Sequence, residues 1–581
     1  NGNVKLDGNY PVGTGNVALG DTALDDASLS GGYNTAIGNE ALTANTSGSV
    51  NVAVGQGTLY LNTTGESNVA VGGNAMADNT TGNYNTAIGR YALTDNTTAS
   101  NNTAVGYQAG YSNTTGTRNT YIGDGSGYLN STSNDNSAFG QNSQNATTGP
   151  HNSSFGSSSL RANTSGTNNT SLGGYSMRLN TTGSSNVGVG KEALYSNTTA
   201  SYNTAVGYQS SYFNTTGANN STLGFSAGKG NTTGGHNTAI GQSAGRATNS
   251  GSANTSVGSD ALRTNSTGAN NTAVGKSSLH SNTTASNNTA VGYEAGYSNT
   301  TGTELTAIGY HSGKSNTTGA ANTAVGFNSL TLNTTGATNN AFGSGALYNN
   351  STGSDNIAVG VNTLVTNTTG SNNVGVGRNA LFSNTTANNN TAIGYNAVKD
   401  NTTGYSLTAI GRDAAHKNTT GSHNTAVGHA SLYTNTTGGN NVAIGRDALN
   451  SNTTASQNTA VGYQAGYNNT TGHRMSAFGY NAAFANTTGI DTVAFGRNAL
   501  ISNTVGNGNT AFGTHALYST TSDNYNTAIG SFSMEATTGG SNTCVGYESG
   551  ISITSGSKNT IIGRYTGNQG GLDIRTSSNN I

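Results

Sequence analysis

The chain repeats one pattern of apolar and polar positions along almost its whole length. Residues 102–116, 288–302 and 458–472 read NTAVGYQAGYSNTTG, NTAVGYEAGYSNTTG and NTAVGYQAGYNNTTG. The glycine that closes each N-T-A-V/I-G element, here called the anchor glycine, occurs 33 times between Gly20 and Gly563. Of the 32 intervals between anchors, 29 are 17 residues long, one is 18 and two are 16. A short fixed period over a whole chain predicts a solenoid or fibre, in which each unit buries its apolar side against its neighbours.

Within each repeat, here called a rung, the three residues before the anchor alternate as in a β-strand. The residue directly before the anchor is Val, Ile, Leu or Phe in all 33 rungs, and two residues earlier stands mostly Thr, Val or Ser, usually with Ala between them. This period of two predicts branched side chains on one face of a short strand and a methyl group on the other. We expect the branched face to form the core, with the following members: Val105, Ile122, Phe139, Leu172, Val291 and Val461.

The second half of each rung has its own apolar position, four residues after the anchor. Leu stands there in sixteen rungs, Met in three and Gly in nine, so Leu194 and its equivalents are predicted to point inward. Where Gly110 replaces Leu, we expect the following Tyr111 to fill the space. The pattern leaves open whether this half is a strand or a helical turn. The closing N-T-T-G predicts a turn whose Asn and Thr side chains form ladders from rung to rung.

These patterns predict an all-β protein, a parallel β-solenoid of 33 rungs with a 17-residue period. Residues 1–15 are interpreted as a cap or lead-in, 16–566 as the repeat shaft, and 567–581 as a transition to a following domain. The anchor glycine is expected to need a positive φ or a close backbone approach. Pro150 lies in one of the two 16-residue intervals, where a bulge or kink is expected.

Composition narrows the possible partners. Charged residues make up 8% of the chain, against about 25% in typical proteins, and the formal net charge is −2. We therefore predict no basic face for nucleic acid, and no membrane insertion because no apolar run approaches the roughly 18 residues of a membrane span. The only cysteine, Cys544, is predicted to be a small buried side chain, which leaves no disulfide framework and no thiolate metal site.

No active site, metal site or cofactor is predicted. The nine histidines lie at scattered positions; His416, His423 and His429 occupy neighbouring rungs, but no acidic residue shares their position. Carboxylates rarely recur at matching positions, which argues against a glycosidase pair.

The position directly after the anchor is often aromatic or cationic and predicts a solvent-facing stripe. Rigid aromatic rings suit sugar binding, whereas the simpler interpretation is a solvated face that keeps the protein soluble. As candidate receptor contacts this stripe contains Tyr107, Tyr208, Tyr293, Tyr310, Tyr395, Tyr463, Tyr480, Arg90, Arg378, Arg412, Arg446 and Arg497.

The strand motif N-T-A-V/I-G with a small residue three positions later resembles the head repeats of trimeric autotransporter adhesins. It resembles more closely the tandem N-T-A-V-G-Y-Q-A-L/G…N-T-T-G arrays of phage and other viral tail fibres, in which a segment like GNQGGLDIRTSSNNI often precedes an endosialidase-type intramolecular chaperone. The 17-residue period is longer than the usual adhesin head rung. The resemblance implies a homotrimeric fibre, and we expect its threefold interface at the small face of the strands, represented by Ala104, Ala290 and Ala460.

These observations together predict the shaft of a phage tail fibre, an extracellular virion part that acts as a rigid spacer and contributes to host attachment. The expected partners are two further copies of the chain, other tail or baseplate proteins, and a host-surface glycan or protein. The alternatives are a bacterial cell-surface trimeric adhesin, a fibre-borne depolymerase and an ice-binding solenoid. Ice binding is disfavoured because the consecutive Thr residues of N-T-T point to opposite faces.

Overall fold

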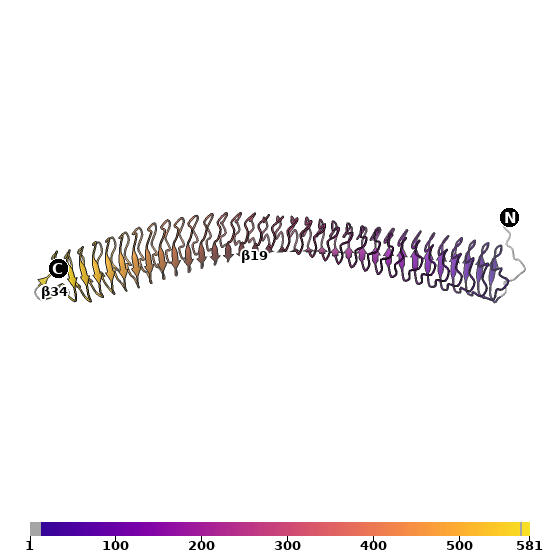
Figure 1. Cartoon of the computed structure of the whole chain (residues 1–581), viewed down its shortest axis with the longest axis horizontal. Helices are drawn as coiled ribbons and strands as arrows, with labels where there is room; N and C mark the ends of the chain where they lie inside the picture. Colours follow the sequence, from indigo (N-terminus) through magenta and orange to yellow (C-terminus); the bar gives the residue numbers. More distant parts are fainter. Residues whose placement is uncertain (1–12, 570–571) are drawn as a thin grey trace. The chain divides into compact units, whose positions relative to one another are not determined.

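The computed structural model describes residues 13–569 and 572–581 and divides the chain into two compact units, 1–288 and 289–581. In each unit, three-residue strands lie side by side, and a loop joins each strand to the next (Figure 1). The first unit contains β1 (Val17–Leu19), β2 (Thr35–Ile37), β3 (Val52–Val54), β4 (Val69–Val71), β5 (Thr86–Ile88), β6 (Thr103–Val105), β7 (Thr120–Ile122), β8 (Ser137–Phe139), β9 (Ser153–Phe155), β10 (Thr170–Leu172), β11 (Val187–Val189), β12 (Thr204–Val206), β13 (Ser221–Leu223), β14 (Thr238–Ile240), β15 (Thr255–Val257) and β16 (Thr272–Val274).

The second unit continues the same pattern and ends in a short hairpin. Its parallel strands are β17 (Thr289–Val291), β18 (Thr306–Ile308), β19 (Thr323–Val325), β20 (Asn340–Phe342), β21 (Ile357–Val359), β22 (Val374–Val376), β23 (Thr391–Ile393), β24 (Thr408–Ile410), β25 (Thr425–Val427), β26 (Val442–Ile444), β27 (Thr459–Val461), β28 (Ser476–Phe478), β29 (Val493–Phe495), β30 (Thr510–Phe512), β31 (Thr527–Ile529), β32 (Thr543–Val545) and β33 (Thr560–Ile562). The hairpin pairs β34 (Asn568–Gln569) with β35 (Leu572–Asp573) in antiparallel fashion.

The predicted all-β parallel β-solenoid with a 17-residue period is confirmed. Among β1–β16 and among β17–β33 every strand pairs in parallel with its neighbours, as in Thr103↔Thr120 and Val105↔Ile122 between β6 and β7. The register follows the 17-residue period, and the described residues contain no helix. Each unit is therefore a parallel β-solenoid.

The faces of the strands are the reverse of those predicted. The central strand residues Ala104, Ala290 and Ala460 are fully buried, with 0% of their surface exposed. The branched residues lie on the outer face, where Leu172 is 47% and Val291 36% exposed. The prediction of core residues was thus wrong for Val105, Ile122, Phe139, Leu172, Val291 and Val461. The alanines cannot form a trimer interface, because their methyl groups lie inside their own chain.

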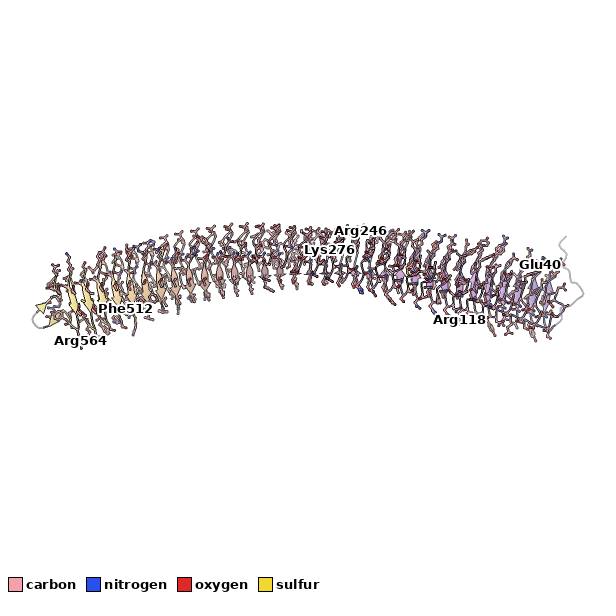
Figure 2. The ribbon with its side chains drawn as sticks, in the orientation of Figure 1. Glu40, Arg118, Arg246, Lys276, Phe512 and Arg564 are labelled. Atoms are coloured by element: carbon pink, nitrogen blue, oxygen red, sulfur yellow. The ribbon has the colours of Figure 1, made fainter. Side chains whose placement is uncertain are left out.

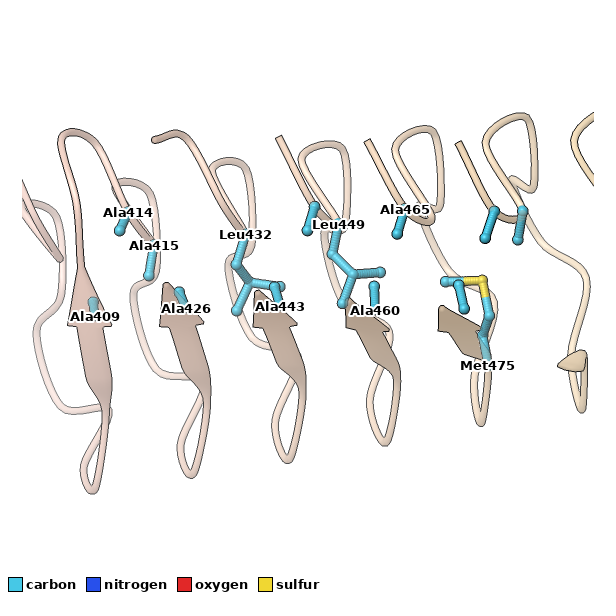
Figure 3. Close-up of a cluster of buried hydrophobic side chains, with 14 of the residues drawn as sticks. Ala409, Ala414, Ala415, Ala426, Leu432, Ala443, Leu449, Ala460, Ala465 and Met475 are labelled. Atoms are coloured by element: carbon cyan, nitrogen blue, oxygen red, sulfur yellow. The ribbon is translucent and has the colours of Figure 1, made fainter. Parts of the chain in front are cut away.

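The narrow cross-section of the rung explains the reversal. Leu194 is fully buried, as are the other leucines four residues after an anchor. In the second unit Leu432 and Leu449 extend from the loops toward the strand residues Ala443 and Ala460 (Figure 3). Because the leucine fills the space inside the rung, only a methyl group fits on the facing strand position.

At Gly110 and Gly466, which replace the leucine, an inward side chain from the following rung occupies the space. A Cβ on Gly110 would lie 2.7 Å from the ring of Tyr121, which stands at the central position of β7. A Cβ on Gly466 would lie 2.3 Å from Cε of Met475. The predicted substitute Tyr111 stays half-buried, so that prediction was wrong.

The second half of the rung is neither strand nor helix. Backbone amides bond to the next rung, as in Leu93 N to Ala109 O at 2.9 Å, and left-handed residues recur two and four positions after the anchor, such as Gln108 (φ 54°) and Leu93 (φ 50°). The anchor itself meets both expectations: Gly106 has φ 138°, and a Cβ there would lie 2.7 Å from the carbonyl carbon of Gly123. This close approach allows the rungs to stack at strand spacing.

Buried asparagines form the predicted ladders. In one ladder each turn asparagine donates to the previous one, as in Asn62 Nδ2 to Asn45 Oδ1 at 2.7 Å, and also to the glycine carbonyl three residues later, as in Asn62 Nδ2 to Gly65 O at 3.1 Å. In the second ladder the backbone N–H of Asn51 donates to Asn34 Oδ1 at 2.9 Å. The ladder asparagines of the N-T-T sequences are buried, so the folded chain does not offer their amides for glycosylation.

The shortened rung at Pro150 keeps its strand register, because Ser137 of β8 pairs with Ser153 of β9. The turn of this rung is one residue shorter, and Thr147 replaces the ladder asparagine there. Its buried hydroxyl has no hydrogen-bond partner among the residues that the structure describes. The predicted bulge therefore does not occur in the strands. Cys544 is buried, as predicted.

Candidate functional site

The outer face of the strands forms an extended surface with two ranks of side chains. One rank holds the branched or aromatic residue before each anchor, and the other holds the first strand residue, usually Thr. In the second unit Phe478, Phe495 and Phe512 stack in successive rungs, with ring centroids 4.2 and 5.2 Å apart. Phe512 is 53% exposed (Figure 2). This surface was missed as a contact face because the face assignment was reversed.

The stripe predicted directly after the anchors lies in solvent, and part of it is brought together. Tyr293 stacks on Tyr310 with centroids 5.4 Å apart, and Tyr463 stacks on Tyr480 at 5.2 Å. Two guanidinium groups lie over rings: Arg412 is 6.0 Å from the Tyr395 ring centroid and Arg446 is 5.8 Å from that of Tyr463. Arg90 contacts Tyr91 rather than another member of the stripe, and Tyr107 packs edge-on against the same Tyr91. Tyr208 stacks on Phe225, whereas Arg378 and Arg497 make no ring contact within the described residues.

Stacking limits what the rings can bind. Tyr310 lies between Tyr293 and Phe327, with centroids 5.4 and 5.3 Å away, so both of its faces are covered. A sugar stacks on a ring face, which leaves such a platform only at the ends of each aromatic ladder. The next rung after Phe327 places the small Ser344 at this position, and Phe327 is 55% exposed. The stripe is thus a set of short ladders rather than a continuous binding surface.

Several charged groups on the surface are paired locally. Glu294 Oε2 lies 2.7 Å from Lys314 Nζ and 3.1 Å from His311 Nε2. The hydrogen bond from Lys314 holds the pKa of Glu294 below its ordinary value, and burial followed by repulsion from Lys314 lowers the pKa of His311. This cluster is a neutralised ion-pair network next to the Tyr293–Tyr310 ladder.

The histidines do not assemble a metal site. His416 Nδ1 lies 3.2 Å from Asp413 Oδ1, whereas His423 packs edge-on against Tyr405. Within the described residues no group of three or more His, Cys, Asp or Glu side chains lies together in a way that could hold a metal ion.

Asp78 and Asp95 stand six residues after successive anchors, so their carboxylates occupy matching positions in neighbouring rungs. Burial, followed by repulsion from Asp78, raises the pKa of Asp95 above its ordinary value. Sequence spacing alone did not single out this pair, although an alignment of the rungs shows it.

The first unit also contains a row of cations that the overall composition does not reveal. The position five residues after the anchor holds Arg161, Arg178, Lys229, Arg246 and Arg263, three of them in successive rungs. The low charge of the whole chain concealed this local row, which an alignment by rung reveals.

The chain matches no protein-family model and no curated protein sequence. Among the described residues, no helix is long and apolar enough to cross a membrane.

Proposed function

We propose that this chain is the shaft of a homotrimeric phage tail fibre, which acts as a rigid spacer and contributes to attachment at the host surface. The tandem repeat and its resemblance to viral tail-fibre arrays support the virion assignment. In this proposal the chain contacts two further copies of itself, other tail or baseplate proteins, and a host glycan or protein. Three copies presenting weak surface contacts together gain avidity beyond any single contact.

The exposed outer face of the strands is the observation that carries the trimer proposal. In each unit this face presents one branched or aromatic side chain per rung, including Leu223 at 50% and Phe342 at 41% exposure. A contiguous apolar surface of this kind is typical of an interaction site in a soluble protein. Because the face repeats in every rung, copies of the same chain are suited to cover it, and the trimer contact moves here from the buried alanines.

The mass of the purified chain in solution tests the trimer. Light scattering is expected to give about three times the chain mass of 58.1 kDa. A cysteine placed in the proposed interface, Val325→Cys, is then expected to cross-link between chains with a short bifunctional maleimide. The matched control Thr335→Cys places its thiol on an exposed turn position and is expected to stay uncross-linked. The native Cys544 does not interfere, because it is buried.

Two results would contradict the proposal in different ways. A mass of one chain removes the trimer. A trimeric mass with cross-linking through Thr335→Cys but not through Val325→Cys keeps the trimer and moves its interface to the turns. A bacterial surface adhesin of the same architecture gives the same mass, and a membrane-anchor domain in the same polypeptide would favour it.

One observation favours a second candidate function, ice binding. The first strand residues lie on the outer face beside the branched rank, and in successive rungs such as those of Thr306 and Thr323 they form a row of hydroxyl and methyl groups. The consecutive Thr residues of the N-T-T turns point to opposite faces, whereas the Thr residues that begin successive strands share one face. A single-chain mass together with thermal hysteresis that Thr306→Lys/Thr323→Lys abolishes would support it over the fibre shaft.

A further inference from the structure

A local excess of positive charge lies in the first unit. Residues 151–288 contain seven Lys and Arg against two Asp and Glu, although the whole chain has a formal charge of −2. Five of the seven cations share the position five residues after an anchor and therefore form one row along the rungs. Arg246 is labelled in Figure 2, and its side chain is exposed.

An open groove of about 570 Å³ accompanies this row. Its walls include Phe213 and Thr264, and between them the same position holds only Gly230 and Ala247. The groove therefore exists because two successive rungs have small residues where the flanking rungs have larger ones. Lys229, Arg246 and Arg263 also line it.

The three cations of the groove are incompletely neutralised. Their rungs are spaced at about 4.8 Å, the separation of neighbouring strands, so their charges repel one another. Arg263 Nε lies 3.6 Å from Asp260 Oδ1, and Lys229 Nζ donates to the neutral Gln209 Oε1 at 2.7 Å. Arg246 has no carboxylate partner within the described residues. A bound anion would relieve this repulsion.

The form of the groove favours a polymer recognised by its charges and hydroxyls rather than by stacking. Phe213 is the one aromatic residue among the lining residues of the groove, and it packs edge-on against Tyr212 with ring centroids 4.7 Å apart. Tyr212 itself has Tyr195 stacked on it at 4.9 Å and Lys229 Nζ 5.8 Å from its ring centroid. Single-stranded nucleic acids bind to several free ring faces in succession, which this groove does not offer. The exposed Asn249 and Thr264 offer polar contacts on the groove wall instead, and guanidinium groups pair with carboxylate or sulfate in two-point contacts.

We propose that Lys229, Arg246 and Arg263 form a binding groove for an acidic polysaccharide, in which successive carboxylate or sulfate groups pair with cations of successive rungs. An acidic polysaccharide of this kind would belong to the host surface that the proposed fibre contacts, so its biological meaning rests on the proposed function. The binding itself is measured on the purified chain whatever its oligomeric state, so a failed trimer and a failed groove give different results.

The test measures binding of fluorescent polygalacturonate to the full chain, with dextran sulfate as competitor and neutral dextran as control. The affinity of the variant Lys229→Gln/Arg246→Gln/Arg263→Gln is expected to be lower by a factor of about ten or more, since the variant loses three charge-assisted contacts. The slope of log affinity against log salt is expected to become shallower by roughly 2. The matched variant Lys399→Gln/Lys417→Gln/Lys558→Gln removes the same charge from exposed or half-buried positions of the second unit and is expected to bind as the unchanged chain does.

Three results would overturn the inference. Equal weakening of binding in both triple variants would mean a general charge effect. Binding of neutral dextran with equal affinity would mean that the groove does not recognise the charges of the polysaccharide. Tighter binding of single-stranded oligothymidylate than of polygalacturonate would make the groove a nucleic-acid site. Far-UV circular dichroism of both variants shows that any loss of binding is not a loss of fold.

Discussion

Removal of one ladder asparagine tests whether buried amide hydrogen bonds hold neighbouring rungs together. Asn418 donates through Nδ2 to Asn401 Oδ1 and to the Gly421 carbonyl, both at 2.9 Å, and accepts from Asn435 Nδ2 at 2.7 Å. In most rungs the glycine carbonyl has a second donor, an asparagine of the other ladder. Here Leu407 stands at that position, so among the described residues Asn418 is the only side chain that donates to Gly421 O.

Asn367 provides a matched site with the second donor present. It donates to Asn350 Oδ1 and to the Gly370 carbonyl, both at 2.8 Å, and accepts from Asn384 at 2.8 Å. Gly370 O also accepts from Asn356 Nδ2 at 2.8 Å. The two asparagines are equally buried, at 0% exposure, so alanine leaves a similar cavity at each.

The expected effect follows from the number of groups left without a partner. Each variant loses three hydrogen bonds at roughly 1 kcal/mol each, so Asn367→Ala is expected to cost about 3 kcal/mol. Asn418→Ala also leaves a buried carbonyl without its side-chain donor, which adds about 1–3 kcal/mol. The difference arises from one neighbouring leucine.

Native-state hydrogen exchange measures the two losses locally, which suits a repeat protein because its unfolding need not be two-state. The reporters are the Thr419 amide, bonded to Thr436 O at 2.9 Å, and the Thr368 amide, bonded to Thr385 O at 2.8 Å. Each additional 1.4 kcal/mol corresponds to about tenfold faster exchange. Equal losses of protection at both sites, or a larger loss in Asn367→Ala, would refute the reasoning.

Three further perturbations test the core, the cysteine and the carboxylate pair. Gly127→Ala places a Cβ 2.3 Å from Tyr121 Cδ1 at φ 65° and should lower the free energy of unfolding by about 2–3 kcal/mol; in the Tyr121→Ala background denaturant melts should show a loss of about 1 kcal/mol, and an unchanged loss would contradict the clash. Burial raises the pKa of Cys544 to about 12, so iodoacetamide at about pH 8 should label it only after unfolding, and labelling of the folded chain would contradict its burial. Because burial and, to a smaller extent, repulsion from Asp78 raise the pKa of Asp95 in the folded state, its charge destabilises the fold, and stability is lost as pH rises from the ordinary pKa of 3.8 through the raised one. Asp95→Asn should remove this loss in melts across pH, and an unchanged profile would contradict the raised pKa of Asp95.

The sequence was sufficient to predict the period, the strands and the ladders, but not which strand face is the core. A period of two places Ala104 and Val105 on opposite faces of the strand but does not determine which face is buried. The larger side chain was assigned to the core because burial of apolar area stabilises. The position of Leu93 inside the rung decides otherwise, because its volume leaves room for only a methyl group opposite.

The residue types in the second half of each rung indicate its left-handed backbone, although the sequence analysis did not predict it. Asn or Asp often stands two residues after the anchor, as at Asn379 and Asp447, and glycine often stands four residues after it, as at Gly110. These residue types tolerate positive φ, and all three positions have it. Leu93 at φ 50° shows that packing outweighs this preference where the core needs a large side chain.

The rungs with glycine four residues after the anchor differ in how well their core is filled, and this difference bears on the proposed groove. Gly110 is compensated by Tyr121, which fills the space that a leucine would occupy. Gly228 and Gly245 have no such partner, since the facing side chains are no larger than Thr222, and a void of about 10 Å³ remains beside them. These uncompensated rungs are the ones that carry the adjacent cations of the groove. The proposed groove and the incompletely packed core therefore occur in the same rungs of the first unit.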